Sequence, residues 1–154
     1  MNLHLIKANI EDSEEIHEMQ LKGYKALLEK YNDYDTNPGA ETLERVERRF
    51  GFDNVDQYFI SLAGENIGYI RIQRLDEDTY RLSQMFIMPE YQDNGYAQTA
   101  IKQAESFYPK AKKWVLDTIK QESKLCYLYE KMGYKLIGVE RNIKAGMDLV
   151  DYAK

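Results

Sequence analysis

The segment MPEYQDNGYAQTAIKQAE, residues 88–105, joins a turn directly to a helix. Its first half contains Pro, Asp, Asn and Gly, which favour a turn. Its second half places small and apolar residues at helical spacing, at Ala97, Ala100, Ile101 and Ala104. Because an apolar run precedes the turn, the segment predicts a strand, a tight turn and a helix in immediate succession.

Gly95 and Ala97 have almost no side chain and stand where this helix begins. The first turn of a helix leaves about four N–H groups unpaired, and the helix dipole adds positive charge there. One interpretation is therefore a loop whose backbone N–H groups bind a phosphate, with Gln92 holding one edge. The other is an ordinary strand–turn–helix joint, in which Gly95 supplies a positive φ and Ala97 packs. Neither GxxxxGKS/T nor GxGxxG occurs in the sequence.

The length of 154 residues fits one domain, residues 1–154, with 44% hydrophobic and 31% charged residues, a balance typical of globular proteins. The single cysteine, Cys126, excludes an internal disulfide framework. The two histidines, His4 and His17, are too few for a His-based zinc site, so we expect no metal. The net charge of −5 argues against general binding to nucleic acid.

The hydropathy pattern also bears on location. No apolar run approaches the roughly 20 residues that a membrane helix needs. The first residues, MNLHLIKANIEDSEE, lack the apolar core and the cleavage site of a secretory signal peptide. We therefore expect a cytoplasmic protein that does not interact with membranes.

Alternating and helical hydrophobic patterns, separated by Gly, Pro, Asn and Asp, divide the chain into strands and helices. The predicted strands are 4–9, 57–64, 65–75, 79–88, 113–119, 134–140 and 147–152. The predicted helices are 11–33, 40–51, 95–108 and 123–134. This order, β-α-α-β-β-β-α-β-α-β-β, predicts an α/β (α+β) fold with a mixed, mostly antiparallel sheet flanked by helices.

The segment FIMPEYQDNGYAQTAI resembles the central motif of the GNAT superfamily of acetyl-CoA-dependent N-acetyltransferases. In that motif a strand ends in an apolar residue, any residue and Pro, and Q/R-x-x-G-x-G/A follows at the head of a helix. The matching residues here are Ile87, Met88, Pro89, Gln92, Gly95 and Ala97. The later segment YLYEKMGY, residues 127–134, is similar to the family's L-Y-E-K-L-G-F signature. The order of elements along the whole chain also resembles the GNAT fold.

The resemblance implies a binding site for acetyl-CoA as co-substrate. The pyrophosphate would rest on backbone N–H groups at the head of the third predicted helix. The residues concerned are Gln92, Asp93, Asn94, Gly95, Tyr96, Ala97 and, close by, Gln98. The pantetheine arm would bond the backbone of Phe86 and Ile87 at the end of the fourth strand. In this family the fourth and fifth strands splay apart, and the thioester lies in the gap.

The same resemblance implies an enzyme that transfers the acetyl group directly from the thioester to a primary amine. The backbone N–H of Ile87 would stabilise the carbonyl oxygen. Tyr129 matches the family tyrosine that often protonates the leaving sulfur, although the alternative is an aromatic residue that only packs its helix onto the sheet. Cys126 is expected to pack, because no histidine neighbours it in sequence and the family forms no acyl-enzyme.

Two family features are missing from this sequence. Many relatives carry an Asn one to two turns before the tyrosine, where it bonds the pantetheine. Here Glu122 lies near that position, and Gln121 beside it is the other residue able to replace the Asn. Many relatives also carry a Glu on the fourth strand as general base, and here that strand contains no acid. Asp117 on the fifth strand is the nearest candidate, with a structural role at the following turn as the alternative.

The acceptor side of the family corresponds to the segment that contains Tyr31, Asp33, Tyr34 and Asp35. Carboxylates and tyrosines there would attract an ammonium group, whereas the alternative is a solvated turn between two helices. The expected partner is a small-molecule amine or a peptide, and exposed C-terminal strand edges allow a homodimer. The alternative function is a non-catalytic acyl-CoA-binding sensor or scaffold.

Overall fold

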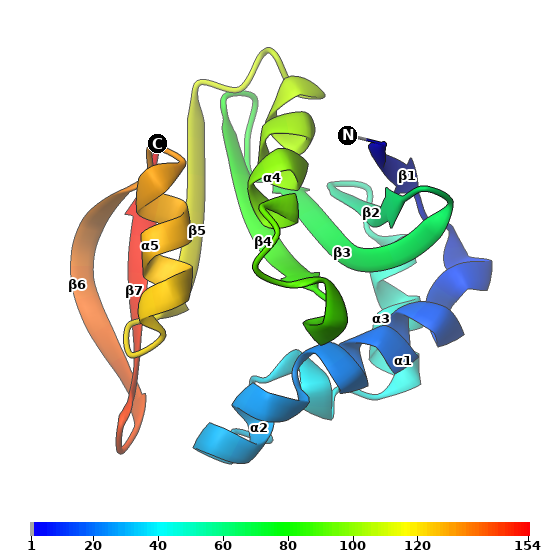
Figure 1. Cartoon of the computed structure of the whole chain (residues 1–154). Coiled ribbons are helices and arrows are strands. Elements are labelled where there is room, and N and C mark those ends of the chain that lie inside the picture. Colours follow the sequence, from blue (N-terminus) through cyan, green and yellow to red (C-terminus); the bar gives the residue numbers. More distant parts are fainter. Residues whose placement is uncertain (1) are drawn as a thin grey trace.

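The structure of the chain is a computed structural model that describes residues 2–154 (Figure 1). The strands are β1 Leu3–Lys7, β2 Val55–Leu62, β3 Glu65–Arg74, β4 Thr79–Ile87, β5 Lys113–Ile119, β6 Lys135–Lys144 and β7 Met147–Ala153. The helices are α1 Ser13–Gly23, α2 Lys25–Tyr31, α3 Leu43–Arg48, α4 Tyr96–Ser106 and α5 Ser123–Lys131. The predicted mixed α/β fold is confirmed.

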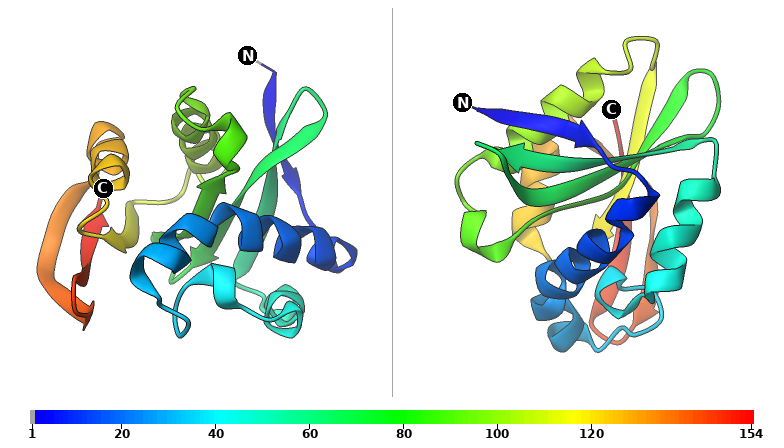
Figure 2. Two further views of the ribbon diagram at one scale, coloured as in Figure 1. Left: turned by 60° about the horizontal axis from the view of Figure 1, so that its bottom comes forward. Right: turned by 90° about the vertical axis from the view of Figure 1, so that its right-hand side faces the viewer.

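Within residues 2–154, seven strands form one sheet in the order β1-β2-β3-β4-β5-β7-β6. All neighbouring pairs are antiparallel except β4 and β5. These two parallel strands pair only where Thr79–Arg81 lie beside Lys113–Val115. Beyond these residues the two strands diverge toward their carboxyl ends. They leave a gap in the sheet between β4 and β5 (Figure 2).

A β-bulge in β4 changes which side chains face each side of the sheet. Arg71 of β3 lies opposite Gln84, but the next residue, Ile72, lies opposite Leu82, so Ser83 is extra. As a result Leu82 packs into the core on one face, whereas Phe86 packs into the core on the other. The bulge lies on the stretch of β4 that has no partner strand on its β5 side.

Two hydrophobic cores fill the two faces of the sheet. The core under α4 and α5 includes Ile101, Leu116 and Tyr129, and the core under α1 and α3 includes Ile16, Val46 and Phe86. The views of Figures 1 and 2 show α4 and α5 on one face and α1 to α3 toward the other. The two groups of helices therefore cover opposite faces of the sheet.

The predicted helix 11–33 is wrong in one respect, because the structure divides it into α1 and α2. The break is at Tyr24, whose φ of −104° and ψ of 2° leave the helical region. Gly23 precedes it, and a Cβ added there would lie 2.7 Å from the Phe86 ring. The chain thus turns where its backbone packs directly against β4, a long-range contact that helical periodicity does not reveal.

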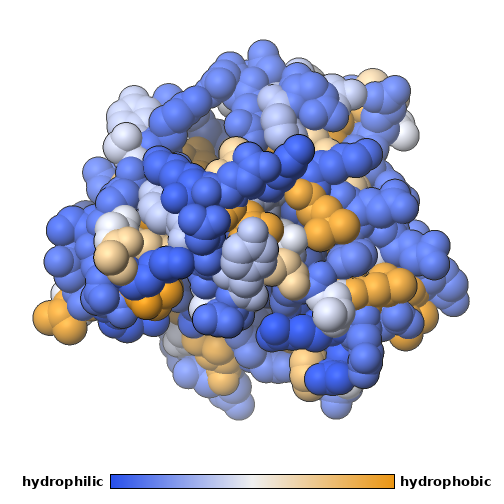
Figure 3. Space-filling view, turned by 90° about the horizontal axis from the view of Figure 1, so that it is seen from below, coloured by the Kyte–Doolittle hydropathy of each residue, from blue (hydrophilic) through white to orange (hydrophobic). Residues whose placement is uncertain are grey.

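Figure 3 shows the end of the molecule toward which β4 and β5 diverge, where most of the surface is hydrophilic and hydrophobic patches are separate. In the part of the chain that the structure describes, no helix is long and apolar enough to cross a membrane. The same residues contain no group of three or more His, Cys, Asp or Glu side chains able to hold a metal ion.

Candidate active site

The loop between β4 and α4 is held by side-chain amides that bond backbone carbonyls. Gln92 donates from Nε2 to the Ile87 oxygen at 2.8 Å, as the interpretation of Gln92 as an edge of the loop requires. Asn94 donates from Nδ2 to the Tyr91 and Gln92 oxygens at 3.1 and 2.9 Å. Because the carbonyls are satisfied inside the loop, its N–H groups remain for another partner.

The backbone N–H groups from Asp93 to Gln98 have no acceptor among residues 2–154. The Gln92 N–H differs from the prediction, because it donates to the Pro89 oxygen at 3.3 Å and closes a short 3₁₀ turn. Gly95 stands within the free row at φ 79°, and a Cβ added there would meet nothing within 4 Å. Open space therefore lies above a row of unpaired donors at a helix N-terminus, which is the arrangement that binds anions.

On the unpaired edge of β4, the backbone of Met85 and Ile87 faces the gap toward β5. The Ile87 oxygen accepts from Gln92, and the Met85 oxygen accepts from the Tyr24 hydroxyl at 3.4 Å. In an antiparallel pair the N–H and C=O of one residue point to the same side, so both N–H groups face the gap. Phe86 differs from the prediction, because its oxygen faces β3, 2.4 Å from where a Cβ on Gly68 would lie.

Tyr129 comes from α5 and is 7% exposed, with its ring packed near Tyr134 and Tyr152. Burial raises the pKa of its hydroxyl, and the negative charge of Asp117 raises it further. Tyr129 is therefore a protonated phenol at neutral pH whose hydroxyl has no hydrogen-bond partner among the described residues.

Tyr24 brings the junction between α1 and α2 to the gap-facing edge of β4. Burial raises the pKa of its hydroxyl, which donates to the Met85 oxygen on the gap-facing edge of β4. The Tyr24 ring also packs edge-on against Phe86, with 5.2 Å between ring centroids. No pattern in the sequence indicates Tyr24 at this position, because the approach depends on the break after Gly23.

Glu122 lies just before α5 and is bound by two side chains of α2. Its carboxylate accepts from Lys30 Nζ at 2.7 Å and from the Tyr31 hydroxyl at 2.5 Å. Burial alone would raise the pKa of Glu122, but these two bonds outweigh it and hold the pKa below its usual value. Glu122 and Tyr31, predicted to bind different ligands, thus join α2 to α5 where β4 and β5 diverge.

Gln121, the other residue expected to replace the missing Asn, also has its side-chain amide bonded within the protein. Its Nε2 donates to an Asp148 carboxylate oxygen at 2.8 Å, and its Oε1 accepts from the Asp148 N–H at 3.0 Å. Asp117 is paired with Arg81 at 2.7 Å and with Arg141 at 3.3 Å, so its carboxylate is neither a free base nor a cap for a turn.

The predicted acceptor residues divide between a buried turn and the surface. Asp33 is 4% exposed, and its carboxylate accepts from the Thr36 N–H at 3.1 Å and from the Thr36 hydroxyl. It therefore serves its own turn, and the expectation that it attracts an ammonium group needs correction. Tyr34 is 66% exposed, and Asp35 lies beside it on the surface.

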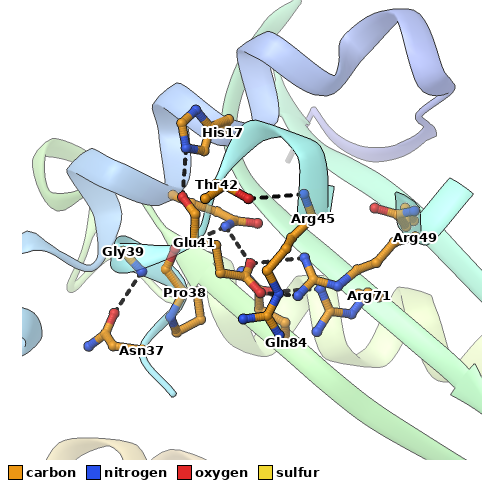
Figure 4. Close-up of polar contacts among 12 residues, drawn as sticks. His17, Asn37, Pro38, Gly39, Glu41, Thr42, Arg45, Arg49, Arg71 and Gln84 are labelled. Carbon is orange, nitrogen blue, oxygen red and sulfur yellow. Dashed lines mark hydrogen bonds and ion pairs between the residues drawn. The ribbon is translucent and has the colours of Figure 1, made fainter. Parts of the chain in front are cut away.

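A polar cluster beneath α1 and α3 was not predicted from the sequence (Figure 4). Its members are Gln20, Glu41, Arg49, Arg71 and Gln84. Arg71 donates from Nη1 to Gln84 Oε1 at 2.7 Å across the β4 bulge. Nearby, Glu41 accepts from Arg49 Nη1 and from Gln20 Nε2, each at 2.9 Å. A charged residue between apolar neighbours in the strand segment IRI was the one available signal, but the bulge that brings Gln84 opposite Arg71 is not readable from the sequence.

The comparisons with known proteins concern the family and the fold of the chain. The model of the acetyltransferase (GNAT) family matches residues 24–134. In sequence, the chain matches no curated protein. Among solved structures it is similar to an acetyltransferase from Thermus thermophilus, with a TM-score of 0.78, 15% identity and coverage of 100% of this chain and 97% of that one.

Two further solved structures have the same fold. One is the spermidine N-acetyltransferase from Vibrio cholerae in complex with CoA and spermine, with a TM-score of 0.80, 20% identity and coverage of 99% of this chain and 95% of that one. The other is the ribosomal L7/L12 alpha-N-protein acetyltransferase RimL in complex with coenzyme A, with a TM-score of 0.79, 14% identity and coverage of 100% and 94%.

Proposed function

Because this chain belongs to the GNAT acetyltransferase family, we propose that it is a single-domain enzyme that transfers an acetyl group from acetyl-CoA to a primary amine. The observation that carries the proposal is the row of unpaired N–H groups from Asp93 to Gln98 beside the line where β4 and β5 diverge. The structures of the Vibrio cholerae enzyme and of RimL with CoA support the choice of co-substrate. The acceptor is a small-molecule amine or a peptide.

The residues of this chain fit coenzyme A. The free N–H groups at the start of α4 suit a diphosphate, because they add to the positive end of the helix dipole. The N–H groups of Met85 and Ile87 on the open edge of β4 suit the amide groups of pantetheine, which would bond there as a short added strand. Both sets of donors lie on one continuous segment of chain, residues 85–98.

The proposed chemistry forms one bond and breaks one. Acetyl-CoA supplies an activated thioester, whose carbonyl carbon is attacked by the neutral amine nitrogen. The C–N bond forms while the C–S bond breaks, and the electron pair of that bond goes to sulfur. The Ile87 N–H stabilises the charge that develops on the carbonyl oxygen. Tyr129, which is protonated at neutral pH, then gives its phenolic proton to the sulfur, and its raised pKa favours return of a proton to the phenolate.

The proton that the amine loses has no carboxylate base on β4 to receive it. Ser83 and Gln84 occupy that part of the strand, and the carboxylate of Asp117 is held in ion pairs. We therefore assign both protons of the acceptor to solvent: the ammonium proton is lost before attack, and the N–H proton that leaves as the amide forms passes to water, from which the Tyr129 phenolate recovers its own proton. The rate should then rise with pH until the free acceptor amine is deprotonated.

The proposal is tested by titrating acetyl-CoA calorimetrically and by measuring release of the CoA thiol with a panel of primary amines and peptides. Saturable uptake together with amine-dependent thiol release is the expected result. Uptake without release from any member of a broad panel would instead favour an acyl-CoA-binding sensor or scaffold. Absence of uptake would remove the family chemistry from this chain.

A further inference from the structure

Gln84 lies between the polar cluster and the gap in the sheet, and Arg71 fixes the orientation of its amide. Arg71 Nη1 donates to Gln84 Oε1 at 2.7 Å, so the Gln84 oxygen faces the guanidinium. The amide nitrogen must then point the other way. Tyr24 lies beside the next residue of the strand, because its hydroxyl donates to the Met85 oxygen at 3.4 Å. That oxygen lies on the gap-facing edge of β4, where we place the pantetheine arm.

The amide nitrogen of Gln84 has no acceptor. Gln84 is 6% exposed, and its Nε2 is a buried donor without a hydrogen-bond partner among residues 2–154. The adjacent Ser83 Oγ is buried and unpaired in the same way. Leaving a buried donor unsatisfied is costly, so Gln84 Nε2 marks a place where a ligand oxygen would be stabilised.

The polar cluster also contains one more guanidinium group than carboxylates. No carboxylate oxygen of residues 2–154 lies within 4 Å of the Arg71 guanidinium. The Glu41 carboxylate is bonded to Arg49, which leaves two guanidinium groups and one carboxylate in the cluster. Burial lowers the pKa of Arg71, and the like charge of Arg49 adds to that effect. A desolvated cation without a counterion favours an anion beside it.

We propose that the acceptor is an aminocarboxylate, whose carboxylate is bound by Gln84 and Arg71 while its amine faces the gap between β4 and β5. This inference rests on the proposed acetyltransferase function and specifies its substrate class. A carboxylate offers two oxygens to the Gln84 Nε2–H and to the guanidinium, which matches the donors present. It also supplies the negative charge that the cluster lacks. A diamine would supply neither.

Matched substrate pairs test the proposal in the thiol-release assay. Lysine is compared with cadaverine, ornithine with putrescine, and phenylalanine with phenethylamine, since each pair differs only by the carboxylate. The wild-type kcat/KM should favour the carboxylate member of at least one pair by about tenfold or more, because a site with buried donors rejects an analogue that leaves them unpaired. Equal values throughout, or a preference for the amines, would overturn the inference.

Three variants locate the effect. Gln84→Leu and Arg71→Met should bring the ratio within a pair close to one, and Gln84→Glu should invert it by placing a carboxylate where the ligand's would lie. Arg74→Met is the matched control, because Arg74 is on the same strand but pairs with Asp56. Thermal unfolding and acetyl-CoA titration of each variant identify any that has merely failed to fold.

A second measurement separates this inference from the proposed function. The carboxylate members are titrated calorimetrically into the complex with CoA. If no amine releases thiol, the acetyltransferase proposal fails, but aminocarboxylate binding that is lost in Gln84→Leu and Arg71→Met still supports the site. Thiol release that ignores the carboxylate, together with the absence of such binding, refutes the inference while the enzyme assignment stands.

Discussion

Gln92 Nε2 donates to the Ile87 oxygen at 2.8 Å, so one side chain connects the end of β4 to the start of α4. This bond holds the last gap-facing residue of β4 beside the first free N–H groups of the loop. The proposed pantetheine and diphosphate contacts are thereby kept in a fixed relation to each other. Preorganised donors of this kind lower the cost of binding, because little order has to be gained when the ligand arrives.

Gly95→Ala should weaken acetyl-CoA binding by about tenfold, or about 1.4 kcal/mol, because its methyl group would enter the space above the free N–H row. Gly64→Ala is the matched control. Both glycines have positive φ, 79° and 88°, and at neither would a Cβ meet an atom within 4 Å. Both substitutions should therefore lower the Tm similarly, while calorimetry shows weaker binding for Gly95→Ala alone. Equal affinities in the two variants would contradict the proposed diphosphate site.

Tyr129→Phe should lower kcat by about 10²–10⁴-fold, because the leaving sulfur loses its proton donor. The KM for acetyl-CoA should change little, since the ring still packs beside Tyr134 and Tyr152. Tyr127→Phe serves as the control, because Tyr127 is on the same helix and is 66% exposed. Steady-state kinetics with saturating amine decide the matter, and an unaltered kcat would exclude Tyr129 as the acid.

Glu122→Gln and Tyr31→Phe should have the same effect, namely faster amide hydrogen exchange across α2, because each removes part of the contact between α2 and Glu122. Lys25→Met is the control, since Lys25 pairs at 4.0 Å with Glu29 on the exposed side of α2. If Glu122 instead binds pantetheine, Glu122→Gln alone should raise the KM for acetyl-CoA. Comparing exchange rates and KM values across the three variants separates the two roles.

Glu41→Gln should destabilise the protein at neutral pH by about 1.5–3 kcal/mol, the usual worth of a hydrogen bond to a charged group. Burial alone would raise the pKa of Glu41, but the bonds from Arg49 and Gln20 outweigh it and hold the pKa below 4.5. A lowered folded-state pKa contributes stability above pH 4.5, which is lost as the pH falls through the folded value.

Urea unfolding at pH 7 and pH 4 measures this contribution, and the gap between wild type and Glu41→Gln should narrow at the lower pH. Glu44→Gln is the control, because the Glu44–Arg48 pair is exposed and should matter little at either pH. A gap that stays constant with pH would show that the ionised carboxylate is not what stabilises the cluster.

Much of the fold was predictable from local pattern. The strands β2, β3 and β4 and the helix α4 follow from alternation, helical spacing and turn residues, and the predicted bounds are close to those observed. The positive φ of Gly95 also follows from its place in the turn. The break at Tyr24 was not predictable, because it depends on the close approach of Gly23 to Phe86.

Only part of the candidate site was predictable from the sequence. The loop from Gln92 to Gln98 could be identified as a candidate because its chemistry is local, although only the structure shows that the Gln92 N–H is occupied. The roles of Glu122 and Asp33 were not readable, since each depends on which donors reach the carboxylate in space. Gln84 faces Arg71 only because of a bulge, and a one-residue shift of register reverses the face of every following side chain.

The order of strands and helices and the small residues at the head of α4 follow from the amino-acid sequence without further information, because they depend on periodicity and on backbone preferences a few residues apart. The folded arrangement was needed to establish that β4 and β5 diverge, that the N–H groups after Gln92 stay unpaired, and that Gln84 meets Arg71. Those features arise from pairing between distant segments, and the energy of such pairing is not encoded in any single stretch of the chain.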